Sequence, residues 1–270
     1  MFARRARINR RMIGVPSGGA APVVPFAPSD IAGMQLWLDA QFPGDLTINT
    51  TPNPDQVSAW LDHHTTAQDL AQATSGDQPE YETAGWGGTL PSVRNRNSTS
   101  DFLHRDGAGV GSMLVGTNMP WTLALTLQIT SIGTPQYLLT FGASTTDSEY
   151  TLLSYDATGQ LSVSQSGPGG VSNTSQSGTL GSTRHNVICR YSGTNINIRV
   201  DGVDVTSGSG ASTPGTRSAL NRFTLGCLRR MFAEAYSNAR FGSCIVYNAN
   251  VSLGDVGDLE TYLAARWPIA

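Results

Sequence analysis

Two glutamates at short spacing are the first residues in this chain that could do chemistry. Glu80 and Glu82 are separated by one residue, so on a strand both would lie on one face, roughly 6.5–7 Å apart. Retaining glycosidases hold a nucleophile and an acid about 5–5.5 Å apart. However, Gln78-Pro79 precedes the pair, which indicates the edge of a sheet, and no third acid follows it. We therefore interpret both carboxylates as solvated edge residues, and we expect no catalytic residue and no enzymatic activity.

Candidate metal ligands are the next group. His63 and His64 follow Asp62, but adjacent strand residues point to opposite faces, so they cannot easily share one ion and are interpreted as isolated polar histidines. Calcium in lectin-like domains is held by loop carboxylates and carbonyl groups. Turn aspartates that could serve are present, but aspartate is common in turns anyway. We expect no metal and no cofactor; the turn aspartates are Asp156, Asp201 and Asp204.

Trp86 is the best candidate for binding a sugar. It stands in a glycine-rich segment, Ala84-Gly-Trp-Gly-Gly88, where no strand periodicity predicts that it is buried. An exposed aromatic ring beside polar groups is what a sugar site requires. A loop tryptophan more often fills a contact between subunits or strands than it stacks on a sugar, and both alternatives stay open. The other four tryptophans are expected in the core: Trp37, Trp60, Trp121 and Trp267.

Arginine is concentrated at the N-terminus. The chain has 270 residues, 17 basic and 20 acidic ones, and all of its basic residues are arginine. Without residues 1–11, 12 arginines remain against 20 acids, a net charge of -8. A basic segment on an acidic body argues against a protein that is coated by nucleic acid, whose basic residues would be spread over a face. The five candidate partner-anchoring residues are Arg4, Arg5, Arg7, Arg10 and Arg11.

Residues 1–28 are predicted to be an extended arm and tether. Glycines and prolines interrupt residues 14–28, so the continuous apolar stretch of a secretory signal is missing and we expect no secretion by that route. Arginine binds carboxylates and phosphates in a bidentate manner. The arm could therefore bind an acidic protein surface or DNA; the acidic body favours the protein surface.

Composition predicts an all-β domain over residues 29–270. Only 14% of the residues are charged, against roughly 25% in an average globular protein. Glycine is abundant and glutamate scarce, which favours strands joined by turns over long solvated helices. No apolar stretch is long enough to cross a bilayer. The three cysteines form no metal-binding pattern; Cys189 and Cys244 lie in apolar strand-like segments and are expected to be buried thiols.

Hydrophobic periodicity predicts at least ten strands and one helix. Residues 121–129 alternate strictly and predict a strand with one buried face, and Asp201-Gly202 predicts a hairpin turn. Near the C-terminus, Ser252 and Asp255 form a capping-box pattern. The helix that follows carries an apolar stripe at Val256, Leu259, Leu263 and Trp267. The other expected strands cover residues 34–39, 57–62, 137–141, 150–155, 161–165, 171–176, 185–191, 196–200, 223–225 and 241–247.

In their order, these segments resemble laminin-G-like, concanavalin A-like jelly-roll domains of bacterial and phage proteins. The resemblance covers residues 29–270 and implies an antiparallel jelly-roll β-sandwich with one C-terminal helix. It implies little about function, since this fold includes lectins, glycosidases and structural modules. It rests on residues 37–39, 57–62, 78–81, 185–193, 198–202, 225–226, 241–248 and 259–267.

The resemblance and the basic arm together predict a non-enzymatic phage virion protein. Our first hypothesis is a capsid decoration protein, made and assembled in the host cytoplasm and exposed on the virion surface. In it the arm anchors a multi-copy module to other virion proteins. The first alternative is a tail or fibre receptor-binding protein that recognises a host glycan. A further alternative is a glycan-binding module or glycosidase. Nucleic acid and membrane partners are disfavoured.

Overall fold

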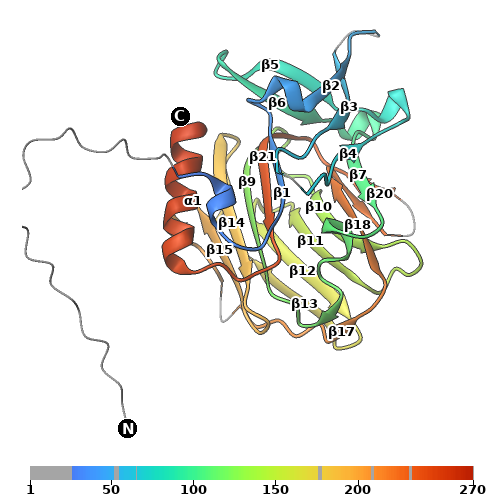
Figure 1. The fold of residues 1–270 in the computed structure, drawn as a ribbon, viewed down its shortest axis with the longest axis vertical. Helices are drawn as coiled ribbons and strands as arrows, with labels where there is room; N and C mark the ends of the chain where they lie inside the picture. The colour runs from blue at the N-terminus through green and yellow to red at the C-terminus, as the bar shows by residue number, and fades with distance from the viewer. Residues whose placement is uncertain are drawn as a thin grey trace, which may run out of the picture.

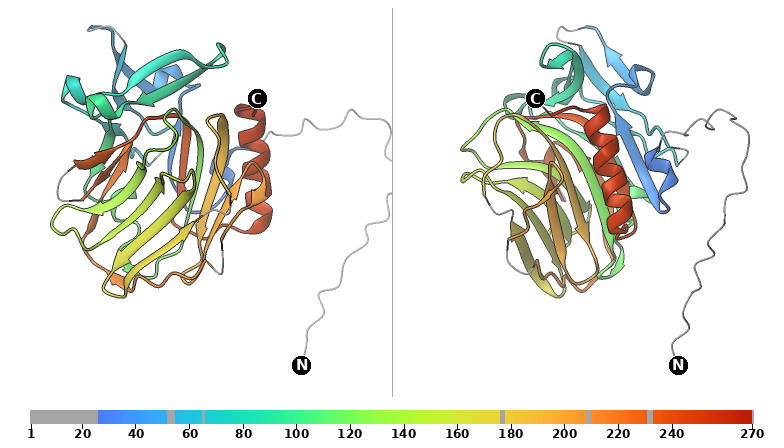
Figure 2. Two further views of the ribbon diagram at one scale, coloured as in Figure 1. Left: turned by 180° about the vertical axis from the view of Figure 1, so that it is seen from behind. Right: turned by 90° about the vertical axis from the view of Figure 1, so that its left-hand side faces the viewer.

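The protein is an antiparallel β-sandwich flanked by one helix (Figures 1 and 2). The computed structural model describes residues 26–269 except 52–54, 65, 176–177, 208–209 and 231–232. One sheet has the strand order β16–β15–β14–β9–β21–β1. The bounds are β16 Val203–Asp204, β15 Ile196–Val200, β14 Arg184–Tyr191, β9 Trp121–Ile129, β21 Ala239–Tyr247 and β1 Met34–Asp39.

The other sheet of the sandwich has the order β13–β12–β11–β10–β18–β7. Hydrophobic residues of both sheets join in one core cluster. The bounds are β13 Gly170–Ser175, β12 Leu161–Gly167, β11 Tyr150–Tyr155, β10 Gln136–Ala143, β18 Leu220–Leu225 and β7 Leu103–Asp106.

A small group of strands extends both sheets at one end of the sandwich, the top in Figure 1. Strand β4 pairs with β7 and β3, while β6 pairs with β21 and β5. Their bounds are β2 Leu46–Asn49, β3 Gln56–Trp60, β4 Leu70–Ala71, β5 Glu80–Trp86 and β6 Leu90–Asn95. Two short antiparallel pairs complete the strands: β8 Gly116–Thr117 with β17 Thr216–Arg217, and β19 Cys227–Arg229 with β20 Ala233–Tyr236. Single 3-10 turns lie at η1 Pro28–Asp30, η2 Pro43–Asp45, η3 Ser75–Asp77, η4 Asn97–Thr99 and η5 Val110–Ser112.

The central strand β9 is buried on both faces, whereas its alternating sequence predicted one solvated face. Its apolar residues point into the sandwich. Its threonines lie on the opposite face, where they are covered and find polar partners. Thr122 donates a hydrogen bond to the Ala249 carbonyl oxygen at 2.8 Å, and Thr126 donates to the Asn186 side chain at 2.7 Å. The alternation therefore identified the polar face of β9 correctly. A covering layer buries this face, which was expected to be exposed to solvent.

Helix α1 (Leu253–Arg266) supplies part of this covering layer and lies beside β14 (Figure 1). It also lies beside β1, as the right-hand view of Figure 2 shows. It begins as predicted. Ser252 accepts a hydrogen bond from the Asp255 amide at 3.2 Å, and the Asp255 side chain accepts one from the Ser252 amide. The predicted stripe Val256, Leu259 and Leu263 is buried, followed by Trp267 after the last turn.

The predicted antiparallel β-sandwich with one C-terminal helix is therefore confirmed. The hairpin at Asp201-Gly202 forms as expected, with Val200 opposite Val203. The four tryptophans expected in the core are all buried, and Cys189, Cys227 and Cys244 are buried and form no disulfide. In the described residues, no helix is both long and apolar enough to cross a membrane.

Candidate functional site

A groove of about 400 Å³ lies where the β5–β6 hairpin meets the sheet that contains β9, β14 and β21. We call it the Trp86–Arg184 groove. In it an aromatic ring, two arginines and neutral hydrogen-bonding groups converge. Residues from five separate segments line it: Gly85, Trp86, Gly87, Thr89, Leu90, Gln128, Ser182, Thr183, Arg184, Arg240 and Pro268.

Strand pairing places the polar side chains of this region in one row. Arg184 of β14 lies opposite Gln128 of β9, which lies opposite Arg240 of β21. Arg240 in turn lies opposite Arg94 of β6, which lies opposite Glu80 of β5. Residues opposite one another in an antiparallel sheet share a face and are neighbours. The row is thus fixed by register, although its members come from distant parts of the chain.

At the β5–β6 end of the row, the positive charges of the arginines are neutralised by Glu82. Glu82 accepts hydrogen bonds from Arg94 at 3.2 Å, from Arg240 at 3.0 Å and from Ser92 at 2.9 Å. Burial acts to raise the pKa of Glu82, but the bonds from Arg240 and Ser92 and the charges of Arg240 and Arg94 outweigh it and lower the pKa. Glu82 is therefore a firmly ionised carboxylate that holds two arginines in place.

The interpretation of Glu80 and Glu82 as solvated edge residues is wrong. Their side chains are only 19% and 15% exposed, because β6 and β21 extend the sheet beside them. Glu80 also lies 3.5 Å from Arg96. A low-pKa, arginine-saturated carboxylate is unsuited to act as a general acid, since that role requires a raised pKa.

Arg184 occupies the opposite end of the row and differs from the arginines near Glu82. Only 9% of the residue is exposed, and its Nε is buried without a hydrogen-bond partner. Its guanidinium carbon lies 5.5 Å from the centre of the Trp86 ring, within the range of a cation–π contact. Within the described part of the chain it pairs with no carboxylate. Burial lowers the pKa of Arg184, yet arginine remains a cation at neutral pH.

Trp86 is placed differently from the exposed ring of the sugar-binding alternative. The residue is only 3% exposed, and its ring meets Trp267 edge-on at 5.2 Å between ring centres. The absent side chain of Gly242 makes this possible, because a Cβ there would lie 2.4 Å from the indole. The ring is therefore not exposed; it fills a contact inside the fold, which is the alternative that the sequence favoured. The ring forms the floor beneath Arg184 and lines the groove, while its role toward sugar remains a prediction.

The histidines form pairs that their sequence positions did not indicate. His63 lies 2.7 Å from Asp45 and stacks on Phe42 with ring centres 3.9 Å apart, so it is not isolated as expected. His185 lies 2.7 Å from Asp201. Each pair is a single imidazole–carboxylate contact. Among the residues described, no group of three or more histidine, cysteine, aspartate or glutamate side chains could hold a metal ion.

The turn aspartates are occupied by donors of their own loops. Asp156 accepts from the amides of Thr158 at 2.8 Å and Gln160 at 3.0 Å. Asp204 accepts from the Thr206 amide at 3.0 Å. These are the local hydrogen bonds for which aspartate is favoured in turns, and they account for both carboxylates without an ion.

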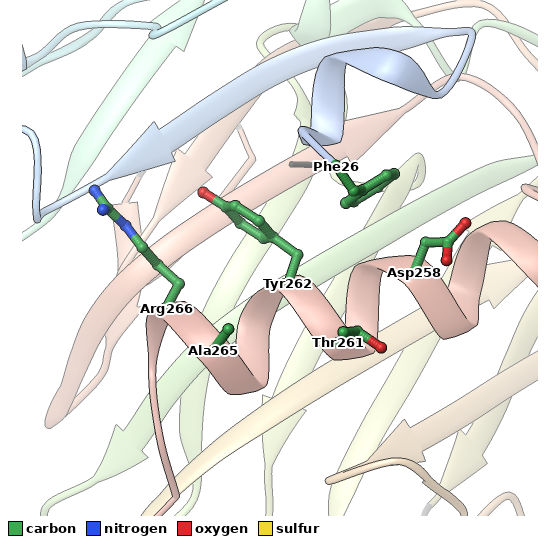
Figure 3. A pocket seen from close by; sticks show the side chains of 6 residues that line it. All are labelled: Phe26, Asp258, Thr261, Tyr262, Ala265 and Arg266. Atoms are coloured by element: carbon green, nitrogen blue, oxygen red, sulfur yellow. The ribbon is translucent and has the colours of Figure 1, made fainter. Parts of the chain in front are cut away.

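A second hollow of about 430 Å³ lies along the outer face of α1 (Figure 3). Phe26, the first residue that the structure describes, lies edge-on to Tyr262 with ring centres 6.3 Å apart. At the end of the helix, Arg266 donates to the fully buried Asp39 at 2.9 Å. Of the two charged residues that line this hollow, Asp258 and Arg266, Arg266 is thus already paired. The hollow therefore offers fewer free polar groups than the Trp86–Arg184 groove.

The five arginines proposed as an anchor lie outside the described residues: Arg4, Arg5, Arg7, Arg10 and Arg11. Their role as a partner-binding arm, and the division at residue 28, remain predictions. Arg184, by contrast, was missed by the sequence analysis. Its only signal in the sequence is a charged residue at the start of an apolar strand, which does not distinguish a buried arginine from an exposed one.

No protein-family model matches the chain. No curated protein matches it either. Among solved structures, it is similar to a sialidase from Trypanosoma rangeli in complex with sialic acid, with a TM-score of 0.57 at 18% identity. That alignment covers 88% of this chain and 34% of the sialidase. A complex of the same sialidase with 2,3-difluorosialic acid, described as a covalent intermediate, gives 0.52 at 19% identity over 95% and 36% of the two chains.

A weaker likeness is to the CBM40 of a Ruminococcus gnavus sialidase bound to α2,6 sialyllactose, with a TM-score of 0.45 and 13% identity over 58% and 98% of the two chains. We base nothing on this likeness. The Trypanosoma comparisons, at their low identities, establish a shared β-sandwich fold; this chain spans about a third of those sialidases. Assignment to laminin-G-like or concanavalin A-like domains in particular remains a prediction.

The comparisons overturn the prediction that this is not an enzyme. That prediction rested on missing glycosidase carboxylates and on a fold interpreted as a structural module. The solved chains that share the fold include sialidases, which are glycosidases, with sialic acid or an inhibitor bound. The absence of a retaining carboxylate pair is thus no ground for excluding enzymatic activity from a chain with this fold.

Proposed function

We propose that this chain is a glycan-binding β-sandwich module and that the Trp86–Arg184 groove is its sugar site. The observation that carries the proposal is the groove itself. Its volume of about 400 Å³ suits one or two sugar rings, and it combines an apolar wall of Trp86, Leu90 and Pro268 with the polar row. Ser182 and Thr183 are exposed at its rim, where hydroxyl groups of a sugar could reach them.

The fold adds support from outside the chain. The Trypanosoma rangeli sialidases with this fold were solved with sialic acid and related sugars. Because sugar-active and sugar-binding proteins share this architecture with structural modules, the fold alone would not carry the proposal. The groove favours a binding module over a purely structural one.

A glycan array tests the proposal directly. We expect the full chain to bind a subset of glycans, and Thr183→Trp to abolish that binding by filling the groove from its rim. Thr183 is exposed, so the larger side chain should leave the fold intact. Val171→Trp is the matched control, because Val171 is 61% exposed on β13 in the other sheet. Binding that survives Thr183→Trp unchanged, or no binding to any glycan, would refute the proposal.

We further propose that the module is mounted on a phage particle by its N-terminal arm. The supporting observation is the charge distribution: five arginines lie between positions 4 and 11, followed by a Pro/Gly-rich segment and an acidic remainder. Arginine suits bidentate contacts with acidic groups of a partner subunit. Glycan binding favours a tail or fibre receptor-binding position over capsid decoration, although both place multiple copies on the virion surface.

Particles assembled with full-length or truncated protein test this placement. We expect particles to retain the full chain and to shed a variant that lacks residues 1–13. Immunogold labelling of intact particles then distinguishes a tail from a head position. Normal docking of the truncated variant would refute the anchoring role, and it would leave the glycan site untouched.

A further inference from the structure

Arg184 carries an uncompensated positive charge in the Trp86–Arg184 groove. Arg94 and Arg240, which belong to the same cross-strand row, share the carboxylate of Glu82. Gln128 separates Arg184 from that group, and its amide is already used: it donates to the Ser182 carbonyl at 2.6 Å and accepts from Arg240 at 3.3 Å. The polar network therefore stops one position short of Arg184.

The Nε of Arg184 is buried without a hydrogen-bond partner, which is unfavourable because its hydration is lost and no protein group replaces it. The Trp86 ring offers only a weak compensation across its face. The guanidinium has five N–H donors in its own plane, and carboxylates match two of them at once. An anionic ligand in the groove would supply the missing charge and the missing hydrogen bonds together.

We infer that the groove selects acidic sugars and that Arg184 binds their carboxylate. This inference rests on the proposed glycan-binding function and narrows it to one ligand class. The carboxylate would take the in-plane donors of Arg184, while the ring and its hydroxyl groups would lie toward Thr183, Ser182 and the apolar wall. Sialic acids and hexuronic acids share the required chemistry, so the test contains both.

The experiment measures binding of four probes by the full chain: 3′-sialyllactose, its methyl ester, trigalacturonate and lactose. We expect one or both acids to bind roughly tenfold or more tightly than lactose, the difference expected for a charged hydrogen bond. The methyl ester should bind no better than lactose, because esterification removes the charge and keeps the rest of the sugar. Preference for the sialoside or the uronate identifies the source of the carboxylate.

Arg184→Met removes the charge but keeps an unbranched side chain over Trp86. We expect it to reduce acid binding to the level of lactose. We also expect its urea midpoint to be equal to or higher than that of the wild type, because an unpaired buried charge is gone. Arg190→Met is the matched control: Arg190 lies further along the same strand, where its NH1 donates to the Val251 carbonyl at 2.9 Å. It should leave the binding of all four probes unchanged.

The outcomes separate the two proposals. Equal binding of the acid, the ester and lactose, lost in Thr183→Trp but kept in Arg184→Met, would overturn the acidic-sugar inference and leave the glycan site standing. No binding of any sugar would overturn both. A large fall in the urea midpoint of Arg184→Met would show that Arg184 is structural.

Discussion

Gly242 of β21 packs so closely against two indole rings that its side-chain position has room for a hydrogen atom only. A methyl group there would lie 2.4 Å from Trp86 and 3.0 Å from Trp267. We expect Gly242→Ala to destabilise the protein by about 1–3 kcal/mol, the range for overpacking a filled core. It should also weaken glycan binding, since Trp86 is the floor beneath Arg184.

Urea unfolding, followed by tryptophan fluorescence, measures the effect. Gly257→Ala is the control, because Gly257 lies in α1 and a methyl group added there would have no atom within 4 Å. There alanine should raise stability by about 0.5–1 kcal/mol, as it does inside an exposed helix. Equal stabilities for Gly242→Ala and the wild type would show that the indole rings can move aside without a loss of stability.

The pKa of His104 gives a second prediction at the scale of a single residue. Burial and, after it, the charge of Arg229 lower the pKa of His104 to about 4 from its ordinary 6.5. The unfolded chain therefore binds this proton at a higher pH than the folded chain does. Stability should fall as pH decreases from about 6.5 towards 4, and the contribution of neutral His104 is fully present only above that window.

Unfolding free energies at several pH values check this expectation in the wild type and in His104→Gln. The variant has no imidazole, so its stability should decline less between pH 6.5 and 4. Other groups that titrate contribute equally to both proteins and cancel in the difference. Parallel curves would mean that His104 is protonated as easily in the fold as in the unfolded chain.

At the scale of elements, Glu82 joins three strands. It lies on β5, receives Arg94 from β6 and receives Arg240 from β21. We expect Glu82→Gln to cost about 2 kcal/mol at pH 7, since hydrogen bonds to a charged group are lost and two arginines remain. Because the fold lowers the pKa of Glu82, its contribution is present above the unfolded value of 4.5 and is lost as pH falls below it.

The difference in unfolding free energy between Glu82→Gln and the wild type should therefore shrink below pH 4.5. Asp258→Asn, an exposed carboxylate on α1, serves as the control and should cost little at either pH. A difference that stays constant down to pH 3 would show that the charge of Glu82 contributes nothing to the strand junction.

Sequence patterns predicted these elements better than the contacts among them. Alternation located β9, apolar strand-like segments located β11 and β14, and the capping box located the start of α1 at Ser252. Those signals depend only on neighbouring residues, so they can be recognised without knowledge of the fold. The ring that Trp86 contacts could not be predicted, because the contact depends on Gly242, which is remote from it in the chain. Arg184 was missed for the same reason, since its groove exists only once β14, β9 and the β5–β6 hairpin meet.

At the scale of the whole molecule, charge divides the chain into a basic segment and an acidic body. The sheet row shows a smaller version of the same division, with paired charges at one end and Arg184 alone at the other. We expect each positive region to favour an anionic partner. The two ligands need not be the same, because a concave groove would select by shape, whereas the N-terminal arginines would act through charge density.

The charge division itself can be measured on the intact chain. Although the net charge is -3, the five arginines between positions 4 and 11 should retain the full chain on a cation-exchange resin at low ionic strength. Attraction over a Debye length of about 10 Å at 0.1 M salt depends on the local charge and not on the sum over the molecule. A chain lacking residues 1–13 should flow through, since 12 arginines then face 20 acids.

A full-length variant with glutamine at the five arginine positions separates charge from length, and it should also flow through. The unfolding midpoint should be unchanged in both, because the described core contains none of these residues. Salt should elute the wild type in one step as the arginines are screened. Equal retention of all three proteins would place the basic surface on the folded body, where Arg184 is the first residue to test.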